Sequence, residues 1–326
     1  MGRKEEPLIH YYDQPAHFAE LINGWIYDGE DCLSPEDITQ ADRRLEQRSG
    51  KRLEKGSYRQ RCRDIFKQAG ELNIRLFVGV ELQENMDYSM PLRVMDMDVI
   101  SYTRQKEFLA AEHRRKKDLN TASSGEFLTG MAKGDRLAPV VTLVLYLSDK
   151  PWDGARSLHE MLNFKNISEK AKKYIENYNI HILDVCHTPD RELQKFPPDI
   201  RFMLMFIKYT KDKKVLADIR QLCGQETIAE DTFDALADYM NEPELWKMKE
   251  KAGTEKGRIN MCEGLRELMA DSKAEGREEG REEGREETTL TSVKNLMETL
   301  KLTAEQAMDA LKIPDDDRKK YVSMLK

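Results

Sequence analysis

The sequence predicts an α/β protein, in which a mixed β-sheet is flanked by helices and is followed by a helical spacer and a small helical tail. Three observations support this fold class. Apolar residues recur at helical spacing in residues 16–26, they form strand-length alternating or continuous runs between residues 62 and 185, and helical periodicity returns between those runs. With 326 residues, of which 39% are hydrophobic, the chain can bury one substantial core.

The first elements are a helix and a pair of strands. Residues 16–26 carry an apolar stripe of helical period, and Ser34 before Pro35 is typical of the start of a second helix. Two strands are expected after that, one at residues 62–66 and one at residues 74–83. Because strand side chains alternate between faces, one face of the second strand carries Phe77, Gly79, Glu81 and Gln83.

The following segments alternate between helix and strand. Residues 90–117 have apolar side chains at three- and four-residue steps and predict a long helix. The continuous apolar run at residues 139–146 is typical of a strand buried on both faces, which we expect near the centre of the sheet. A short strand is predicted at residues 180–185, and helices are predicted at residues 198–209 and 215–222.

Composition divides the chain into four segments. Residues 1–225 form the predicted core domain, and we expect helices from there to the end of the chain. Residues 226–270 are a helical extension, residues 271–289 are a charged spacer with a Glu-Gly-Arg-Glu repeat, and residues 290–326 are a small helical tail. Each glycine inside a helix costs about 1 kcal/mol relative to alanine, so the spacer is a marginal helix, and self-association through its glycines is the alternative.

The formal net charge of −7 hides two opposed segments. Residues 43–63 hold nine basic and two acidic residues and lead directly into Asp64, whereas residues 271–287 hold eight acidic and four basic residues. A basic segment that leads to an acidic site is suited to a polyanionic substrate, because the phosphates of such a substrate require positive charges nearby. The alternative interpretation is a solvated, charged surface.

The composition also excludes several classes of protein. No apolar run approaches the roughly 20 residues that span a bilayer, and the first residues are too polar for a signal peptide, so we expect a soluble, cytoplasmic protein without a membrane partner. The five cysteines show no Cys-x-x-Cys spacing, which argues against a zinc site and against a disulfide framework.

An acidic pair marks the candidate site. Asp64 is close enough in sequence for a hairpin to bring it beside Glu81, and Gln83 shares a strand face with Glu81. Two adjacent carboxylates repel each other, and a divalent cation removes that conflict. This arrangement indicates a metal-dependent phosphodiesterase. The alternative is structural, with Asp64 as an ion-pair partner, Glu81 as a strand-end acid and Gln83 as a polar edge residue.

The motifs around these residues resemble the recombination-promoting nuclease (Rpn), or putative transposase, family of the PD-(D/E)XK nuclease superfamily. The segments that carry the resemblance are Phe18-Ala-Glu20-Leu-Ile-Asn23, Arg63-Asp64-Ile-Phe-Lys67, Val78-Gly-Val-Glu81-Leu-Gln83, Tyr88-Ser-Met-Pro91-Leu-Arg93 and the apolar run at residues 139–146. The resemblance implies a restriction-endonuclease-like core that cleaves DNA with Mg²⁺, for which Mn²⁺ is a substitute, and that promotes recombination.

The resemblance also implies roles for individual residues. Asp64 and Glu81 match the metal-binding acids, Gln83 matches the position of the superfamily lysine, and Glu20 matches the acidic position of the first helix. The carbonyl of Leu82 is a further expected Mg²⁺ ligand. Since glutamine cannot carry the charge of a lysine, the identity of a general base stays open.

The leading hypothesis is a Mg²⁺-dependent DNA endonuclease of low sequence specificity. A core of this kind usually needs two sites to cut both strands, so a homodimer is one expectation of this hypothesis. The alternatives are a catalytically inactive nucleic-acid-binding or assembly module with the same fold, and a nuclease acting on RNA. The residues predicted to contact the nucleic-acid backbone are Arg59, Arg61, Arg63, Arg93, Arg114 and Arg115.

Overall fold

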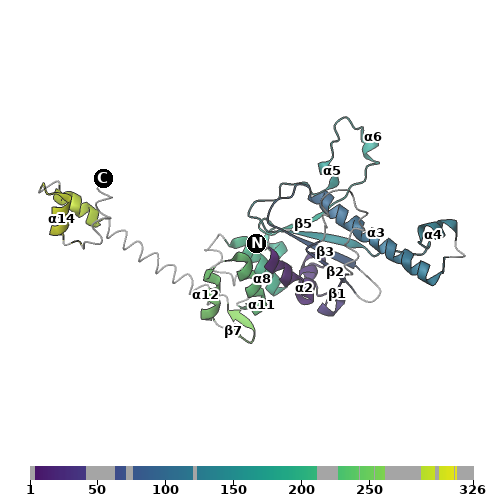
Figure 1. Ribbon diagram of the computed structural model, residues 1–326, viewed down its shortest axis with the longest axis horizontal. Helices are drawn as coiled ribbons and strands as arrows, with labels where there is room; N and C mark the ends of the chain where they lie inside the picture. Colours follow the sequence, from purple (N-terminus) through teal and green to yellow (C-terminus); the bar gives the residue numbers. More distant parts are fainter. Residues whose placement is uncertain are drawn as a thin grey trace, which may run out of the picture. The chain divides into compact units, whose positions relative to one another are not determined.

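The computed structural model describes most of the chain (Figure 1). The described residues are 4–41, 63–70, 76–119, 123–210, 227–241, 243–252, 254–260, 288–297, 301–311 and 313. They fall into two compact units, Met1–Glu263 and Gly264–Lys326, which are described separately below.

A five-stranded mixed sheet forms the centre of the first unit, which confirms the α/β class. Its strands are β1 (Ile38–Gln40), β2 (Ile65–Ala69), β3 (Leu76–Gln83), β4 (Val140–Tyr146) and β5 (His181–Asp184), in the spatial order β1-β2-β3-β4-β5. β1, β2 and β3 are antiparallel neighbours, and β3, β4 and β5 are parallel neighbours. β4 is an internal strand, as its apolar run predicts, but β3 is the central one.

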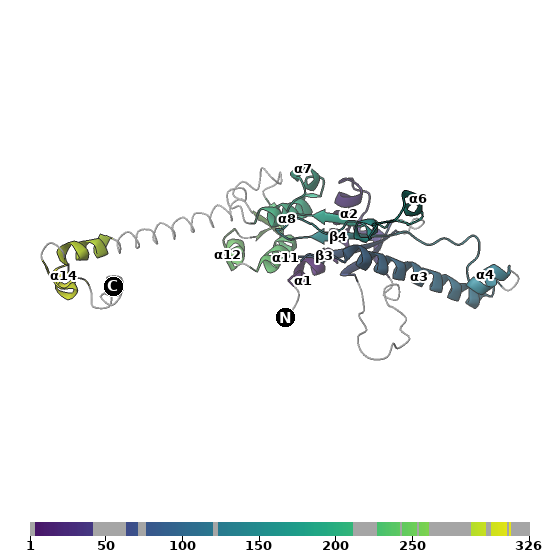
Figure 2. The same ribbon diagram turned by 90° about the horizontal axis from the view of Figure 1, so that it is seen from above.

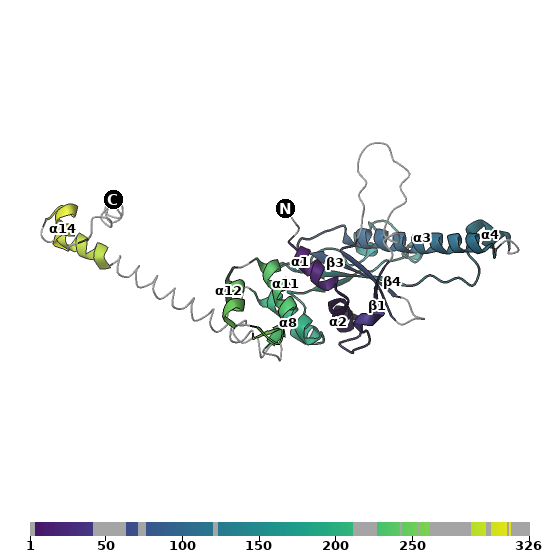
Figure 3. The same cartoon turned by 60° about the horizontal axis from the view of Figure 1, so that its bottom comes forward.

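Helices cover both faces of this sheet. Figure 3 shows α3 on one face and α2 with α8 on the other. The helices of the unit are α1 (Glu6–Tyr12), α2 (Pro15–Ile26), η1 (Pro35–Asp37), α3 (Met90–Lys116), α4 (Ser124–Thr129), α5 (Leu158–Met161), α6 (Glu169–Lys172), α7 (Asp190–Leu193), α8 (Pro198–Tyr209), α11 (Glu230–Met240) and α12 (Pro243–Ala252). The predicted helices at residues 16–26, 90–117 and 198–209 are thereby confirmed, whereas the start at Ser34 is a single 3₁₀ turn closed by a capping box.

Side-chain alternation decides which strand residues meet α3. Val94 and Met97 of α3 pack in one buried cluster with Val144 and Tyr146 of β4. In the parallel β3–β4 register, Val144 lies beside Glu81 and Tyr146 lies beside Gln83, so these side chains share the face that α3 covers. The polar positions of β3 therefore lie under the first turns of α3.

The helix α3 continues beyond the sheet. Its 27 residues span about 40 Å at 1.5 Å per residue, and it carries α4 at its far end (Figures 1 and 2). Gly130, with φ of 69°, ends α4, and a Cβ atom there would lie 2.6 Å from the Cβ of Ala110. A glycine is therefore required where α4 turns back against α3.

The prediction of an entirely helical chain beyond residue 225 is wrong. A second, three-stranded antiparallel sheet is formed by β6 (Thr227–Ala229), β7 (Thr254–Glu255) and β8 (Arg258–Asn260). Ile228 and Ile259 are paired across β6 and β8 and are fully buried. Strands of two or three residues are too short to show a period of two in the sequence, which is why this sheet was not predicted.

The second unit contains a small helical core. Residues 288–297 are helical, and α14 (Ala304–Ala310) begins at a capping box, in which the Thr303 hydroxyl accepts a hydrogen bond from the backbone N–H of Gln306. Val293, Ala307, Met308 and Ile313 form its buried cluster. The predicted helix at residues 215–222 and the repeats at residues 275–287 lie outside the described residues. None of the helices in the described part of the chain is both long and apolar enough to cross a membrane.

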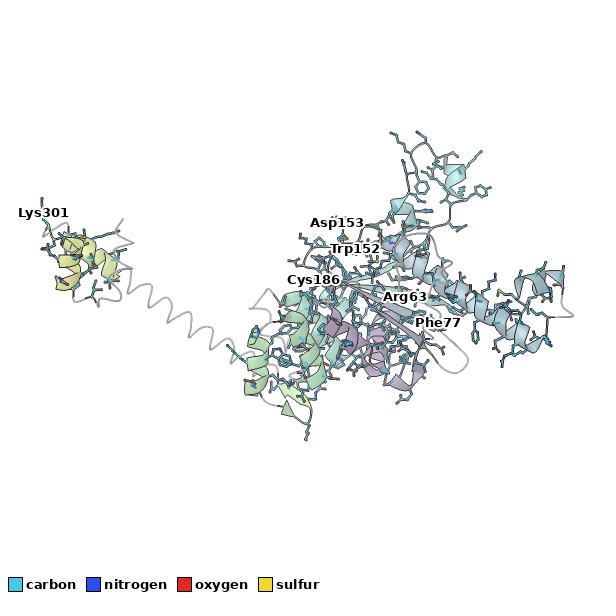
Figure 4. All side chains as sticks on the ribbon, viewed as in Figure 1. Arg63, Phe77, Trp152, Asp153, Cys186 and Lys301 are labelled. Atoms are coloured by element: carbon cyan, nitrogen blue, oxygen red, sulfur yellow. The ribbon has the colours of Figure 1, made fainter. Side chains whose placement is uncertain are left out.

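A buried arginine joins three elements of the first unit. Arg63, whose side chain is 1% exposed, donates to Thr142 Oγ1 of β4 at 3.0 Å and to Ser101 Oγ of α3 at 2.9 Å, and it forms an ion pair with Asp98. Its side chain crosses β3 at Gly79, where a Cβ atom would lie 2.2 Å from Arg63 Cδ. Glycine at position 79 thus makes room for the side chain of Arg63, which is labelled in Figure 4.

We expect Arg63→Ala to lower the free energy of unfolding by about 3–5 kcal/mol, because it leaves the Asp98 carboxylate buried without its cation. Arg115→Ala is the matched control, since Arg115 is 72% exposed and pairs with Glu112 at the surface, where an ion pair contributes less than about 1 kcal/mol. Urea unfolding followed by circular dichroism measures both values. Equal midpoints for the two variants would contradict the structural role of Arg63.

Candidate active site

The pairing of β2 with β3 brings Asp64 and Glu81 together. Ile65 is paired with Val80 in an antiparallel register, so Asp64, the residue before β2, lies opposite Glu81. The backbone N–H of Asp64 donates to Glu81 Oε1 at 3.1 Å, and the backbone N–H of Leu82 donates to Asp64 Oδ2 at 2.9 Å. Each strand therefore orients the carboxylate of the other, as a hairpin between these segments predicts.

The two carboxylates differ in burial and in acidity. Glu81 is fully buried, whereas Asp64 is partly exposed at the edge of the pair. Burial, and next the charge of Asp64, raise the pKa of Glu81 to about 7, although the cations of Arg93 and Arg63 act in the opposite direction. The Glu81 carboxyl group is thus poised between its protonated and ionised forms near neutral pH.

Arg93, in the first turn of α3, forms an ion pair with Glu81. Its Nη2 lies 2.5 Å from Glu81 Oε2, and its Nη1 lies 3.6 Å from Asp87 Oδ2. The side chain of Asp87 in turn accepts hydrogen bonds from the backbone N–H and the hydroxyl of Ser89. Arg93 therefore ties the acidic pair to the loop that joins β3 to α3. The sequence indicated Arg93 as a phosphate contact but did not reveal Asp87 as its second partner.

Gln83 and Leu82 complete the strand end. Gln83 is the last residue of β3, is partly exposed, and shares the sheet face of Glu81. The N–H and C=O of one strand residue point to the same side of the strand, so the Leu82 carbonyl faces the edge on which its N–H meets Asp64. The predicted residues Asp64, Glu81, Leu82 and Gln83 are thus gathered at one end of the β2–β3 pair.

The donor set suits a hard divalent cation. Two carboxylates and a backbone carbonyl are oxygen ligands of the kind that Mg²⁺ and Mn²⁺ prefer, and Mg²⁺ commonly takes only one or two protein carboxylates. Burial, and next the charge of Asp64, raise the pKa of Glu81, and a nearby divalent cation would act against both effects. Within the described ranges, no group of three or more His, Cys, Asp or Glu side chains is arranged to hold a metal ion, so a metal here would depend on the carbonyl and water.

Glu20 lies in a different set of contacts. Its Oε2 is 3.6 Å from Nδ1 of His17 in the same helix, and the other ring nitrogen of His17 bonds to Asp231 at 2.9 Å. The carboxylate also contributes to the raised pKa values of the buried Tyr11 and Tyr12, after the larger effect of desolvation. These contacts place Glu20 at the packing of α1, α2 and α11, and its role at the acidic pair stays a prediction.

The structure places the residues predicted to bind the nucleic-acid backbone in different environments. The prediction for Arg63 is wrong, because its guanidinium group is buried and bonded to Thr142, Ser101 and Asp98. Arg59 and Arg61 lie outside the described residues. Arg114 and Arg115 are exposed on the extended part of α3, about 30 Å along the helix from Arg93. They belong to a surface well separated from the acidic pair.

Comparison with family models matches residues 75–234 to the family described as putative transposase, YhgA-like. Glu81, Gln83 and Arg93 lie inside the matched segment, whereas Glu20 and Asp64 precede it. The comparison with curated proteins finds no match, and the comparison with solved structures finds none either.

We expect the buried Glu81 carboxyl group to make stability depend on pH. Its folded pKa of about 7 lies above the ordinary glutamate value of 4.5, so its contribution to stability is complete below pH 4.5 and is lost as the pH rises through 7. Glu81→Gln removes this dependence, and the difference in free energy of unfolding between the variant and the parent changes by roughly 3 kcal/mol across that window in metal-free buffer.

Urea unfolding at a series of pH values measures this change. Glu169→Gln is the control, because the Glu169 side chain is 83% exposed and its replacement leaves the pH dependence of the parent unchanged. Parallel stability curves for the parent and Glu81→Gln would rule out a titrating Glu81.

Proposed function

Because the chain belongs to the YhgA-like family of putative transposases, which is the Rpn family, we propose that it is a metal-dependent DNA endonuclease. In this proposal it hydrolyses phosphodiester bonds with little sequence specificity and promotes recombination, and its core is a restriction-endonuclease-like sheet. The observation that carries the proposal is the mutual orientation of Asp64 and Glu81 by the β2–β3 pair. DNA as the substrate rests on the family.

The residues of the pair have separate tasks in the proposed reaction. Asp64, which is partly exposed, and the Leu82 carbonyl present oxygen ligands at the end of the strand pair. Glu81, which is buried, adds a ligand oxygen in its ionised form, and Arg93 stabilises that form. When bound, Mg²⁺ supplies Lewis-acid charge at the scissile phosphate, and Mn²⁺ can take its place.

Gln83 is the proposed positioning group for the attacking water. It lies two residues beyond Glu81 on the same strand face, within the part of the chain that matches the family. Its amide donates and accepts hydrogen bonds but takes up no proton at neutral pH, so it orients water without acting as a base. Since the cleavage of both strands requires two such sites, a homodimer is part of this proposal.

A second candidate is a nucleic-acid-binding module without catalysis. The observation that favours it is the 2.5 Å ion pair between Arg93 and Glu81, because an arginine that already neutralises the buried acid reduces the need for a metal. The glutamine at position 83, where the superfamily has lysine, points in the same direction. DNA binding that weakens with salt, without cleavage in either Mg²⁺ or Mn²⁺, would support this candidate.

Nicking of supercoiled plasmid DNA tests the proposed hydrolysis. We expect Asp64→Asn and Glu81→Gln each to lower the nicking rate by about 100-fold or more, because each removes a charged oxygen ligand while preserving side-chain volume. Chelation of divalent metal by EDTA abolishes nicking by the parent protein. Activity is measured by the conversion of supercoiled plasmid to open circles on a gel.

Glu169→Gln is the matched control for this assay, since it removes an exposed carboxylate on α6 that pairs only with Lys172 among the described residues. Its nicking rate stays within about twofold of the parent rate. If Asp64→Asn and Glu81→Gln cut as fast as Glu169→Gln, the proposed site is not the nuclease site.

A further inference from the structure

A cavity of about 720 Å³ lies next to the acidic pair but does not include it. It is formed where the parallel strands β3, β4 and β5 end, and α8 and α11 close its other side. The lining residues that matter below are Met86, Tyr88, Tyr146, Lys150, Asp153 and Tyr239. Figure 4 labels Asp153 and Cys186, two residues that line the cavity. Crevices at the carboxyl ends of parallel strands are where open α/β sheets bind ligands.

Strand β3 and the loop that follows it connect the cavity to the acidic pair. Gln83 is paired with Tyr146 in the β3–β4 register, and Tyr146 lines the cavity. The loop after β3 contributes Glu84 and Tyr88 to the lining, and the same loop is held to Glu81 through Asp87 and Arg93. A ligand in the cavity would therefore contact the loop that Arg93 connects to the acids.

The lining combines aromatic and thioether groups with lysines. Tyr88 is 64% exposed, and the Asp153 carboxylate, by its charge and by a hydrogen bond, raises the pKa of the Tyr88 hydroxyl. Met86 and the buried Tyr146 also line the cavity and supply apolar surface to it. Such a combination of ring faces and cations is the chemistry that binds an unstacked base and its phosphate.

The charges of the lining favour one lysine as the phosphate ligand. Lys4 Nζ lies 2.5 Å from Oε1 of Glu84, and the same carboxylate accepts a hydrogen bond from the Tyr239 hydroxyl. Lys208 Nζ likewise lies 2.5 Å from Oδ1 of Asp190, so both lysines already have a carboxylate partner. Lys150 is exposed, and no carboxylate lies within ion-pair distance of its ammonium group in the described part of the chain. Lys150 therefore offers its charge to a ligand.

We propose that this cavity receives one unpaired nucleotide of the DNA strand that is cut, with its base against Tyr88 and its phosphate beside Lys150. This inference rests on the proposed nuclease function and adds a substrate preference to it. A base held in a duplex is stacked and paired, so an unpaired or extruded base is the one whose ring face is free to lie against Tyr88. The preferred substrate then contains single-stranded DNA at the cleavage site.

Binding of a fluorescent thymidine oligonucleotide, measured by anisotropy in EDTA, tests the cavity without cleavage. We expect Tyr88→Ala to weaken this binding by about 10-fold, in line with the loss of one base–aromatic stack, and to leave binding of a blunt duplex within about twofold. Tyr88→Phe keeps the ring and binds the oligonucleotide as the parent does. Lys150→Gln weakens oligonucleotide binding to a lesser degree, because one phosphate contact is lost.

Tyr174→Ala is the matched control, since Tyr174 is 87% exposed and does not line the cavity. The proposal is overturned if Tyr88→Ala binds the oligonucleotide like Tyr174→Ala, or if it weakens oligonucleotide and duplex equally. Thymidine monophosphate that binds as tightly as the oligonucleotide would assign the cavity to a free nucleotide and would also overturn it. Because these measurements exclude metal, they are independent of whether Asp64 and Glu81 support nicking.

Discussion

The buried contact between Arg63 and Asp98 is the constraint on which the rest of the site depends. Arg63 precedes Asp64 directly, and its side chain passes over Gly79 of the central strand to reach β4 and α3. Asp98 also accepts hydrogen bonds from Thr142 and from Tyr178, so each of its oxygens has a partner. A buried charge without partners is strongly destabilising, and this network therefore holds the start of β2 in one position. Asp64 is placed beside Glu81 as a consequence.

The degree of burial explains the raised pKa of Glu81 in the acidic pair. Two guanidinium groups, those of Arg63 and Arg93, lie close enough to stabilise the Glu81 carboxylate, yet desolvation is the larger effect and its pKa remains near 7. Asp64 differs because it lies at the partly exposed end of the strand pair. Asp64 is thus accessible to solvent, whereas the buried Glu81 ionises more readily when a cation binds beside it. In the proposed nuclease, this arrangement couples ionisation of the site to binding of a divalent cation.

The sheet topology explains why the acids and the cavity are neighbours yet distinct. Glu81 is oriented from the antiparallel side of β3 by β2, whereas the cavity is built on its parallel side by β4 and β5. The central strand therefore belongs to both, and the loop after it, anchored by Arg93, is shared. In the proposed nuclease, hydrolysis and substrate recognition could accordingly be changed separately, because no hydrogen bond or ion pair joins Tyr88 or Lys150 to either acid among the described residues.

The sequence by itself determined several of the longer helices and strands and the faces on which their side chains lie. The helices over residues 16–26, 90–117 and 198–209 and the buried strand at residues 139–146 follow from local periodicity, which a single segment carries. The short distance in sequence between Asp64 and Glu81 predicted a hairpin between them, and the tertiary contacts of Arg63 fix its start. Tertiary structure alone decided the burial of Arg63, the contact of Arg93 with Glu81, the small sheet after residue 225 and the cavity beyond β3. These features join residues far apart in the chain, and a basic residue has the same sequence signal whether it binds phosphate or a buried carboxylate. Only the packing of α3 and β4 around position 63 distinguishes the two roles.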